Sequence, residues 1–181
     1  MHPFQIIANA DKAISRFPGW SKADDEDDYS HFQAPLSIND MTEAGLFLEG
    51  GTYAHIPDQN VCFEVVLLTH GGAKRHKLMR VDWRSLKGGH TNQRRFDCPG
   101  ECPKRTGDTH FHSFDINWRK AEQKLRSPRL PCAVDIEDNL QSFEELRSFV
   151  GKHFRIKNID LVLPPEWEYT FQYGNAAARS G

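Results

Sequence analysis

Residues 61–69 read VCFEVVLLT, a stretch that is apolar nearly throughout. A strand of this kind is covered on both of its faces, so we place it at the centre of a sheet. Gly71 and Gly72 then turn the chain. Residues 75–83 (RHKLMRVDW) alternate between apolar and polar side chains, which predicts the neighbouring strand of an antiparallel hairpin.

Further strands are predicted before and after this pair. We place a hairpin turn at Gly50 and Gly51, because paired glycines favour the tight turns of hairpins. Residues 154–163 are expected either to finish the sheet or to pack on it. The other segments that read as strands are residues 32–38, 44–56, 109–116 and 132–136.

Helical periodicity is found in residues 4–17, 118–126 and 142–150. Pro18 and Gly19 end the first helix, and Ser142 with Glu145 forms a capping box at the start of the last one. We therefore predict an α+β fold, in which an antiparallel sheet of five to seven strands carries two or three helices packed on one face. The expected core contains Val61, Phe63, Val65, Val66, Leu67, Leu78, Val81, Phe114, Phe143, Leu146 and Phe149.

The composition is typical of one globular domain. The chain has 181 residues, of which 38% are hydrophobic and 11% aromatic, enough to bury a substantial core. No apolar run approaches the ~20 residues that a membrane-spanning helix needs. The first residues lack a basic leader followed by an apolar block, so we expect no secretory signal. The prediction is a single cytoplasmic domain over residues 1–181 with no membrane partner.

Charge is distributed unevenly along the chain, although the formal net charge is −2. Between Gly19 and Glu64 ten residues are acidic and one is basic. Between Lys74 and Arg105 ten residues are Lys or Arg and three are acidic, an excess of seven positive charges. Either the two surfaces complement each other within the fold, or the basic segment binds phosphate groups.

Three segments are predicted to be irregular. An acidic loop spans residues 22–31, because the five consecutive acids at 24–28 repel one another. Residues 84–108 form a long basic, polar loop, and a loop of this length inside a compact domain is usually functional or tied down. Residues 175–181 are expected to be a disordered tail.

Three histidines lie in or directly after the long loop. His90 is in the loop, and His110 and His112 are in the strand predicted at 109–116. With a period of two, His110 and His112 share a face about 7 Å apart and can converge on one ion or phosphate. Histidine transfers protons near neutral pH and also binds metals. A pair of hydrogen-bonded surface histidines would show the same spacing, but His90 favours a functional site.

Cys98 and Cys102 straddle a Pro-Gly turn, a spacing that suits half of a tetrahedral zinc site. Free thiols or a local disulfide are the alternatives. Cys62 and Cys132 lie in apolar segments, and we expect both to be buried thiols in a reducing environment. The remaining zinc ligands would be His110 and His112, or His90.

Arg80 and Asp82 lie two residues apart on the strand predicted at 75–83, so their side chains share a face. An ion pair on a sheet is the simpler interpretation. In the functional interpretation, Arg80 holds a phosphate or carboxylate and Asp82 orients a histidine.

The order of three short motifs, R-x-D at 80–82, H-x-N at 90–92 and H-x-H at 110–112, resembles that of the small bacterial toxins of the TumE-like group and of related domains encoded beside antitoxin or defence genes. In those domains a strand meander precedes the motifs and a helix with aromatic residues follows them, which would here be residues 142–154. The resemblance covers roughly residues 60–156 and implies a ribonuclease-like toxin. Cys98, Cys102 and the acidic loop depart from the pattern.

The first hypothesis is a toxin-like protein of a bacterial toxin–antitoxin or defence system that cleaves RNA without a metal, with an antitoxin as a possible partner. A histidine would take the proton from the ribose 2′-hydroxyl, and another would protonate the leaving 5′ oxygen. The residues assigned to proton transfer are His110, His112 and His90. The phosphorane would be stabilised by Arg80, with Arg94 or Arg95. A histidine tautomer would be set by Asp82 or Asn92.

The second hypothesis is a non-catalytic module of phage defence or counter-defence, in which one structural zinc stiffens the basic loop that docks on nucleic acid or protein. Its metal ligands would be Cys98, Cys102, His110 and His112. A third possibility is a structural domain whose basic face meets an acidic partner. The residues expected to contact nucleic acid are Arg84, Lys87, Asn92, Arg94, Arg95, Lys104 and Arg105.

Overall fold

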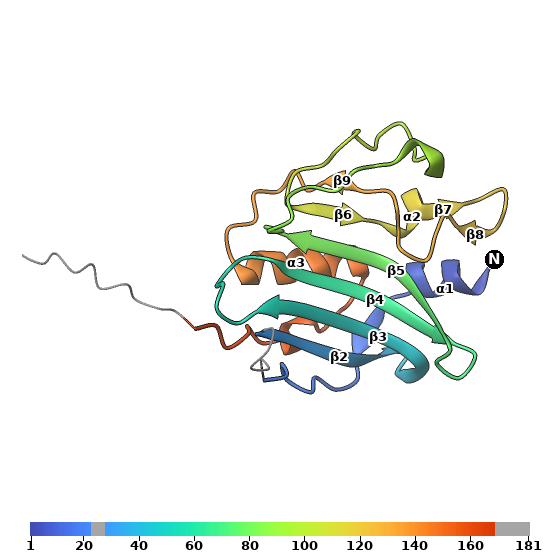
Figure 1. The fold of residues 1–181 in the computed structure, drawn as a ribbon. Coiled ribbons are helices and arrows are strands. Elements are labelled where there is room, and N and C mark those ends of the chain that lie inside the picture. The colour runs from blue at the N-terminus through green and yellow to red at the C-terminus, as the bar shows by residue number, and fades with distance from the viewer. Residues whose placement is uncertain (23–27, 169–181) are drawn as a thin grey trace, which may run out of the picture.

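An antiparallel sheet of seven strands lies at the centre of the fold (Figure 1). The computed structural model describes residues 1–22 and 28–168. The strand order is β1-β2-β3-β4-β5-β6-β9, so most neighbours in the sheet are also neighbours in the chain. The predicted α+β fold is confirmed. The strands are β1 (Lys12–Ile14), β2 (Tyr29–Ile38), β3 (Met41–Tyr53), β4 (Val61–Thr69), β5 (Lys74–Trp83), β6 (His110–His112) and β9 (Val134–Asp135).

Helix α3 (Phe143–Phe154) packs behind the sheet and covers one of its faces (Figure 1). The helix begins at the predicted capping box, in which the Ser142 hydroxyl accepts a hydrogen bond from the Glu145 N–H at 3.2 Å. All predicted core residues are buried. The smaller elements are α1 (Pro3–Asn9), α2 (Phe114–Asn117), the paired strands β7 (Trp118–Arg119) and β8 (Lys124–Leu125), and 3₁₀ turns at Arg94–Phe96 and Ile159–Leu161.

Strand β4 shows how the sheet separates its two faces. Val61 and Phe63 are buried in the apolar core with the side chains of α3. Cys62 and Glu64 alternate with them and therefore point to the opposite side of the sheet. We call this second side, which α3 does not cover, the open face. It carries the polar side chains of the chain's motifs.

The predicted helix over residues 4–17 is wrong beyond Asn9, where α1 ends. The following residues form the edge strand β1 instead. Ile14 is buried there, and its backbone N–H and C=O are both bound by the Asn158 side chain, at 2.7 and 3.0 Å. The helical spacing of the apolar residues was misleading, because they belong to two elements: Ile7 lies in α1 and Ile14 lies in β1.

Lys12 lies buried directly after α1, with 1% of its surface exposed. Burial lowers the pKa of its ammonium group to about 8. The ammonium satisfies carbonyl groups that the end of a helix leaves without partners. It donates to the backbone oxygens of Ile7, Ala8 and Ala10, at 2.9, 3.2 and 2.7 Å.

Replacing this ammonium should destabilise the fold. Lys12→Met keeps most of the side-chain volume but leaves the three carbonyls unpaired, and we expect the free energy of unfolding to fall by about 2–4 kcal/mol in urea titrations. Lys22→Met, at an exposed position, is the control and should change it by less than about 0.5 kcal/mol. Equal stabilities of the two variants would contradict the assignment.

The hairpin between β2 and β3 turns at Asn39 and Asp40, not at Gly50 and Gly51 as predicted. Both turn residues have positive φ, 50° and 62°, as tight hairpin turns require. The two glycines lie inside β3. A Cβ on Gly50 would lie 2.2 Å from the Phe32 ring of β2, and a Cβ on Gly51 would lie 1.8 Å from the Tyr29 hydroxyl. Glycine is needed there for close packing and not for a turn.

Two other predicted segments differ from the structure. Residues 118–126 form the β7–β8 hairpin instead of a helix, closed by a positive φ of 50° at Gln123. The strand predicted at 109–116 ends at His112, and Ser113 caps the short helix α2. In the segment predicted to finish the sheet or pack on it, Ile156 bridges to β1 in parallel and a 3₁₀ turn contacts α3.

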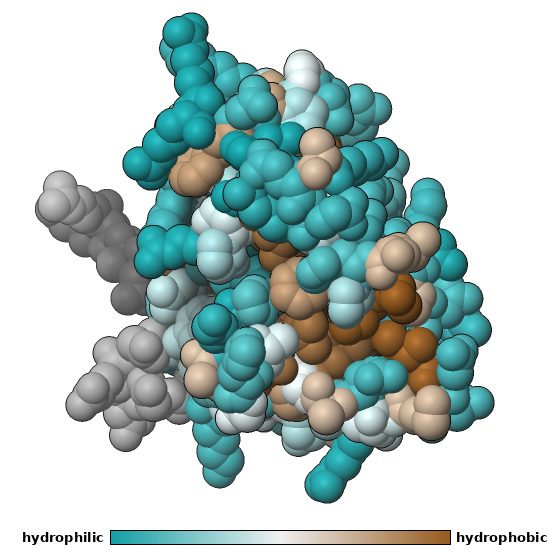
Figure 2. Space-filling model, turned by 90° about the vertical axis from the view of Figure 1, so that its right-hand side faces the viewer, coloured by the Kyte–Doolittle hydropathy of each residue, from teal (hydrophilic) through white to brown (hydrophobic). Residues whose placement is uncertain are grey.

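Apolar side chains gather in one area on the side of the molecule where α1 lies (Figure 2). Within the described ranges, no helix combines the length and the apolar character needed to cross a bilayer. Of the acidic loop predicted at 22–31, residues 23–27 lie outside the described residues, and the loop prediction is wrong from Tyr29, where β2 begins. The predicted tail at 175–181 also lies outside the described residues.

Candidate metal centre

The R-x-D and H-x-H motifs lie side by side on the open face, because β5 pairs with β6. The register places Arg80 opposite His112 and Asp82 opposite His110. Asp82 Oδ2 is 3.4 Å from His110 Nε2 and 3.7 Å from His112 Nε2. Four residues of the predicted site are thus brought together by strand pairing.

The guanidinium of Arg80 is bound to two carboxylates. It donates to Asp82 at 2.6 and 2.5 Å and to Glu64 at 3.0 Å. Burial alone would raise the pKa of Asp82, but His110 and the hydrogen bonds and charge of Arg80 outweigh it and hold this pKa far below its usual range. Arg80 therefore acts as the counter-ion of a buried aspartate, and its donors are not directed at an external phosphate.

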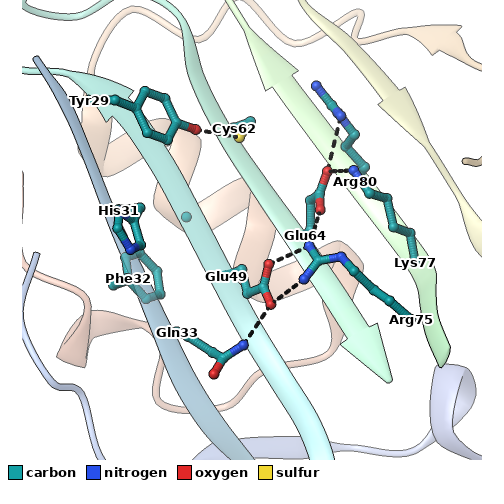
Figure 3. A pocket seen from close by; sticks show the side chains of 11 residues that line it. Tyr29, His31, Phe32, Gln33, Glu49, Cys62, Glu64, Arg75, Lys77 and Arg80 are labelled. Carbon is teal, nitrogen blue, oxygen red and sulfur yellow. Dashed lines mark hydrogen bonds and ion pairs between the residues drawn. The ribbon is translucent and has the colours of Figure 1, made fainter. Parts of the chain in front are cut away.

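Glu64 is a member of the site that the sequence analysis missed. It is 6% exposed and accepts hydrogen bonds from Arg75 and Arg80, each at 3.0 Å, and from Lys77 (Figure 3). A carboxylate inside an otherwise apolar strand, two residues after Cys62, was the available signal. Such a residue must find cations on the same face of the sheet.

His90 reaches the other two histidines from the long loop. Its backbone N–H donates to Thr106 Oγ1 at 2.8 Å, and its carbonyl accepts from the Thr106 N–H at 2.9 Å. Gly89 permits this approach, because a Cβ there would lie 1.6 Å from the Thr106 carbonyl oxygen. The His90 ring centroid lies 4.7 Å from that of His112 and 5.9 Å from that of His110.

Each of these three imidazoles donates one ring N–H to a backbone carbonyl. Since a carbonyl oxygen can only accept, the bonded nitrogen carries the hydrogen and the other nitrogen of a neutral ring has a free lone pair. One ring nitrogen from each histidine lies within 4.8 Å of the other two, so the group could hold a metal ion. The donor–acceptor pairs are His90 Nε2 to Pro131 (2.8 Å), His110 Nδ1 to Gly107 (3.1 Å) and His112 Nδ1 to Cys132 (3.1 Å).

The histidines are shielded from solvent. His110 and His112 are each 4% exposed, and His90 is half-buried. Burial lowers the pKa of His112 to about 3, although the charge of Asp82 opposes this shift. His112 is therefore neutral at pH 7, which is the form that ligates metals. The same burial keeps both strand histidines away from the solvent-exposed surface.

Asn92 fastens the long loop to the segment before β9. Its Nδ2 donates to the carbonyls of Pro103 and Ala133 at 2.6 and 2.9 Å, and its Oδ1 accepts from the Ala133 N–H at 2.8 Å. Both ends of the amide are engaged in these internal bonds. Asn92 consequently positions the loop. Its amide is used for these backbone bonds, so it neither binds a histidine ring nor points outward toward a nucleic acid.

The cysteines differ from the predicted zinc site. Cys98 forms a disulfide with Cys132 across 34 residues, so the expectation that Cys132 is a free thiol is wrong. Cys102 and Cys62 are free and half-buried. In the described part of the chain, the group able to hold a metal contains no cysteine. Cys98 and Cys132 are distant in the sequence, and only the path of the loop brings them together.

The cations of the long loop fall into two groups. The Arg84 guanidinium lies 4.5 Å from the Trp83 ring centroid and donates to the Asp58 carbonyl at 3.2 Å, so it supports the start of the loop. The others present their charges to solvent. These exposed residues are Lys87, Arg94, Arg95, Lys104 and Arg105.

Comparison with known proteins assigns no family to this chain. No protein-family model matches the chain, and no curated protein or solved structure is significantly similar to it. The resemblance to TumE-like toxins therefore stays a prediction from short motifs, and the site is interpreted from its own geometry.

The close approach at Gly89 gives a test of how the loop positions His90. Gly89→Ala should force the two loop segments apart and lower the free energy of unfolding by about 1–3 kcal/mol in urea titrations. Gly100→Ala is a matched control in the same loop, since nothing lies within 4 Å of a Cβ at that position. A Gly89→Ala protein as stable as the Gly100→Ala protein would contradict the observed loop packing.

Proposed function

We propose that the protein is an RNA-binding module in which a zinc ion, held by His90, His110 and His112, fixes the basic loop on the sheet. The observation that carries this proposal is the grouping of the three rings. Each ring uses one nitrogen for a backbone carbonyl, and one nitrogen of each ring lies within 4.8 Å of those of the other two. Hydrogen bonds of this kind orient imidazoles that bind metals and strengthen them as ligands.

Asp82 supports the presence of a cation at this centre. The Nε2 atoms of His110 and His112 lie 3.4 and 3.7 Å from the same carboxylate oxygen, Asp82 Oδ2. The neutral His112 ring turns a lone pair toward this carboxylate, a repulsion that a positive charge at the centre relieves. A metal ion held by the three rings would supply this charge, while Asp82 stays bound to Arg80. Zinc suits a site of three imidazoles and takes a fourth ligand in tetrahedral geometry.

The proposed ion has a structural role. Two of its ligands come from β6 and one from the long loop, so it connects the loop directly to the sheet. The two histidines of β6 are almost fully buried, which agrees with a structural ion. The ion stiffens the base of the loop, and its exposed cations are presented to a partner at a lower entropic cost.

RNA is the partner that agrees with the loop charges and with the motif resemblance. Five exposed Lys and Arg side chains supply the sequence-independent attraction to phosphates. The resemblance to ribonuclease-like toxins favours RNA over DNA. A toxin–antitoxin or defence context would add an acidic protein partner that covers the same loop.

RNA cleavage is a second candidate, favoured by the contact of Asp82 with two histidines. A carboxylate beside an imidazole is the arrangement that orients a general base. Cleavage requires the histidines to contact the reacting phosphodiester, whereas His110 and His112 are each 4% exposed. Under this candidate, the sheet and loop must separate before reaction.

Metal content tests the zinc centre. We expect about one zinc per chain by mass spectrometry after purification without added metal, and a lower unfolding midpoint after chelation. His90→Gln should remove the zinc. His70→Asn is the control because His70 is exposed with a positive φ of 54°, which asparagine tolerates. Absence of zinc in the parent protein, together with no uptake of added zinc, would sink the proposal.

Fluorescence anisotropy with labelled RNA tests the loop. Replacing four loop cations by Gln should weaken binding at least tenfold at about 0.1 M salt and flatten the salt dependence, because phosphate contacts are lost. An equal loss of RNA affinity in a control protein with four other exposed lysines replaced would contradict a role for the loop. Incubating the protein with the same RNA and running the products on denaturing gels detects cleavage. The loop set is Arg94, Arg95, Lys104 and Arg105. The control set is Lys22, Lys120, Lys124 and Lys152.

A further inference from the structure

Two hollows adjoin on the open face of the sheet. The first, of about 560 Å³, lies across β2 to β5 (Figure 3). The second, of about 350 Å³, extends it past the end of β5 to Lys87, the first exposed cation of the basic loop. Both volumes are in the range of ligand pockets. They form one trough because they share Tyr29, Cys62 and Arg80.

Aromatic rings line the end of this trough that is nearest to β2. Tyr29 pairs with Tyr53 across the β2–β3 ladder, and their rings meet edge to face with centroids 5.2 Å apart. Tyr29 lies flat over Gly51, where a Cβ would be 1.8 Å from its hydroxyl oxygen. His31, two residues further along β2, lies nearly parallel to Tyr29, at 16°. The sheet thus presents π-surfaces on its open side.

The charged side chains of the trough offer donors rather than acceptors. In the first hollow, Glu49 and Glu64 are already bound by Arg75, Lys77 and Arg80. Arg80 is also the counter-ion of Asp82, so over both hollows the cations Arg75, Lys77, Arg80 and Lys87 face the carboxylates Glu49, Glu64 and Asp82. The cations are also more accessible to solvent than the carboxylates: the Arg75 side chain is 42% exposed, whereas that of Glu64 is 7% exposed. The surplus N–H groups suit an anionic ligand that carries many acceptors.

We propose that this trough binds a single strand of RNA. Unpaired bases stack on Tyr53 and Tyr29, and phosphates lie along Arg75 and Lys77 of β5 and along Lys87 of the basic loop. Aromatic side chains combined with a basic groove are the recurring means of holding unpaired nucleotides. A duplex cannot use the trough, because its bases are stacked on one another. This inference rests on the proposed RNA-binding function and names the form of RNA.

The test compares a single-stranded 12-nucleotide RNA with its duplex by fluorescence anisotropy. We expect the parent protein to bind the single strand more tightly, and Tyr53→Leu to weaken single-strand binding about tenfold while leaving duplex binding unchanged. Tyr53→Phe keeps the ring and should bind as the parent does. The unfolding midpoints of the two variants show whether both are folded.

Crosslinking of the unmodified protein provides a second measurement, independent of any variant. Single-stranded RNA containing 4-thiouridine should crosslink to peptides that hold Tyr29 or Tyr53. Equal affinity for strand and duplex, or crosslinks confined to residues 84–108, would overturn the trough as a binding site and leave RNA binding by the loop intact. Failure of the parent protein to bind either RNA would overturn the proposed function itself.

Discussion

The buried carboxylate of Asp82 is the group on which the rest of the site depends. A charge in this position requires a counter-ion, which Arg80 supplies through two hydrogen bonds. Arg80 also binds Glu64, Glu64 binds Arg75, and Arg75 reaches Glu49. Alternating charges therefore cross three strands of the open face. Truncating one member leaves a partner buried and unpaired, which typically costs several kcal/mol.

The long loop is irregular in its secondary structure but is fastened at many points. Gly89 lets two of its segments approach, Asn92 binds the segment before β9, and the Cys98–Cys132 disulfide closes the same region. The carbonyls of residues 131 and 132, beside this disulfide, also orient two of the histidine rings. The covalent and hydrogen-bonded supports of the loop thus set the geometry of the histidine cluster.

Burial separates two roles on this face. The two histidines of β6 lie below the surface, where the neutral His112 ring and a nearby carboxylate favour a bound cation. The more accessible groups are aromatic rings on β2 and β3 and cations on β5 and the long loop. A ligand with both flat bases and phosphates can contact the two sets at once.

Local sequence determined the elements that depend on near neighbours. The strand at 61–69, its partner ending at Trp83 and the capping box at Ser142 follow from alternation and short-range hydrogen bonding. The same reasoning misplaced the turn at Gly50 and Gly51, because those glycines accommodate aromatic side chains of another strand.

The sequence by itself placed R-x-D and H-x-H on strands, and it indicated that the long loop carries chemistry. Only the tertiary structure decided that His90 joins His110 and His112, and that Cys98 pairs with Cys132 instead of working with Cys102. The physical reason is that both choices depend on the path of an irregular loop. That path is set by contacts between residues distant in the chain, which no periodicity of the sequence records.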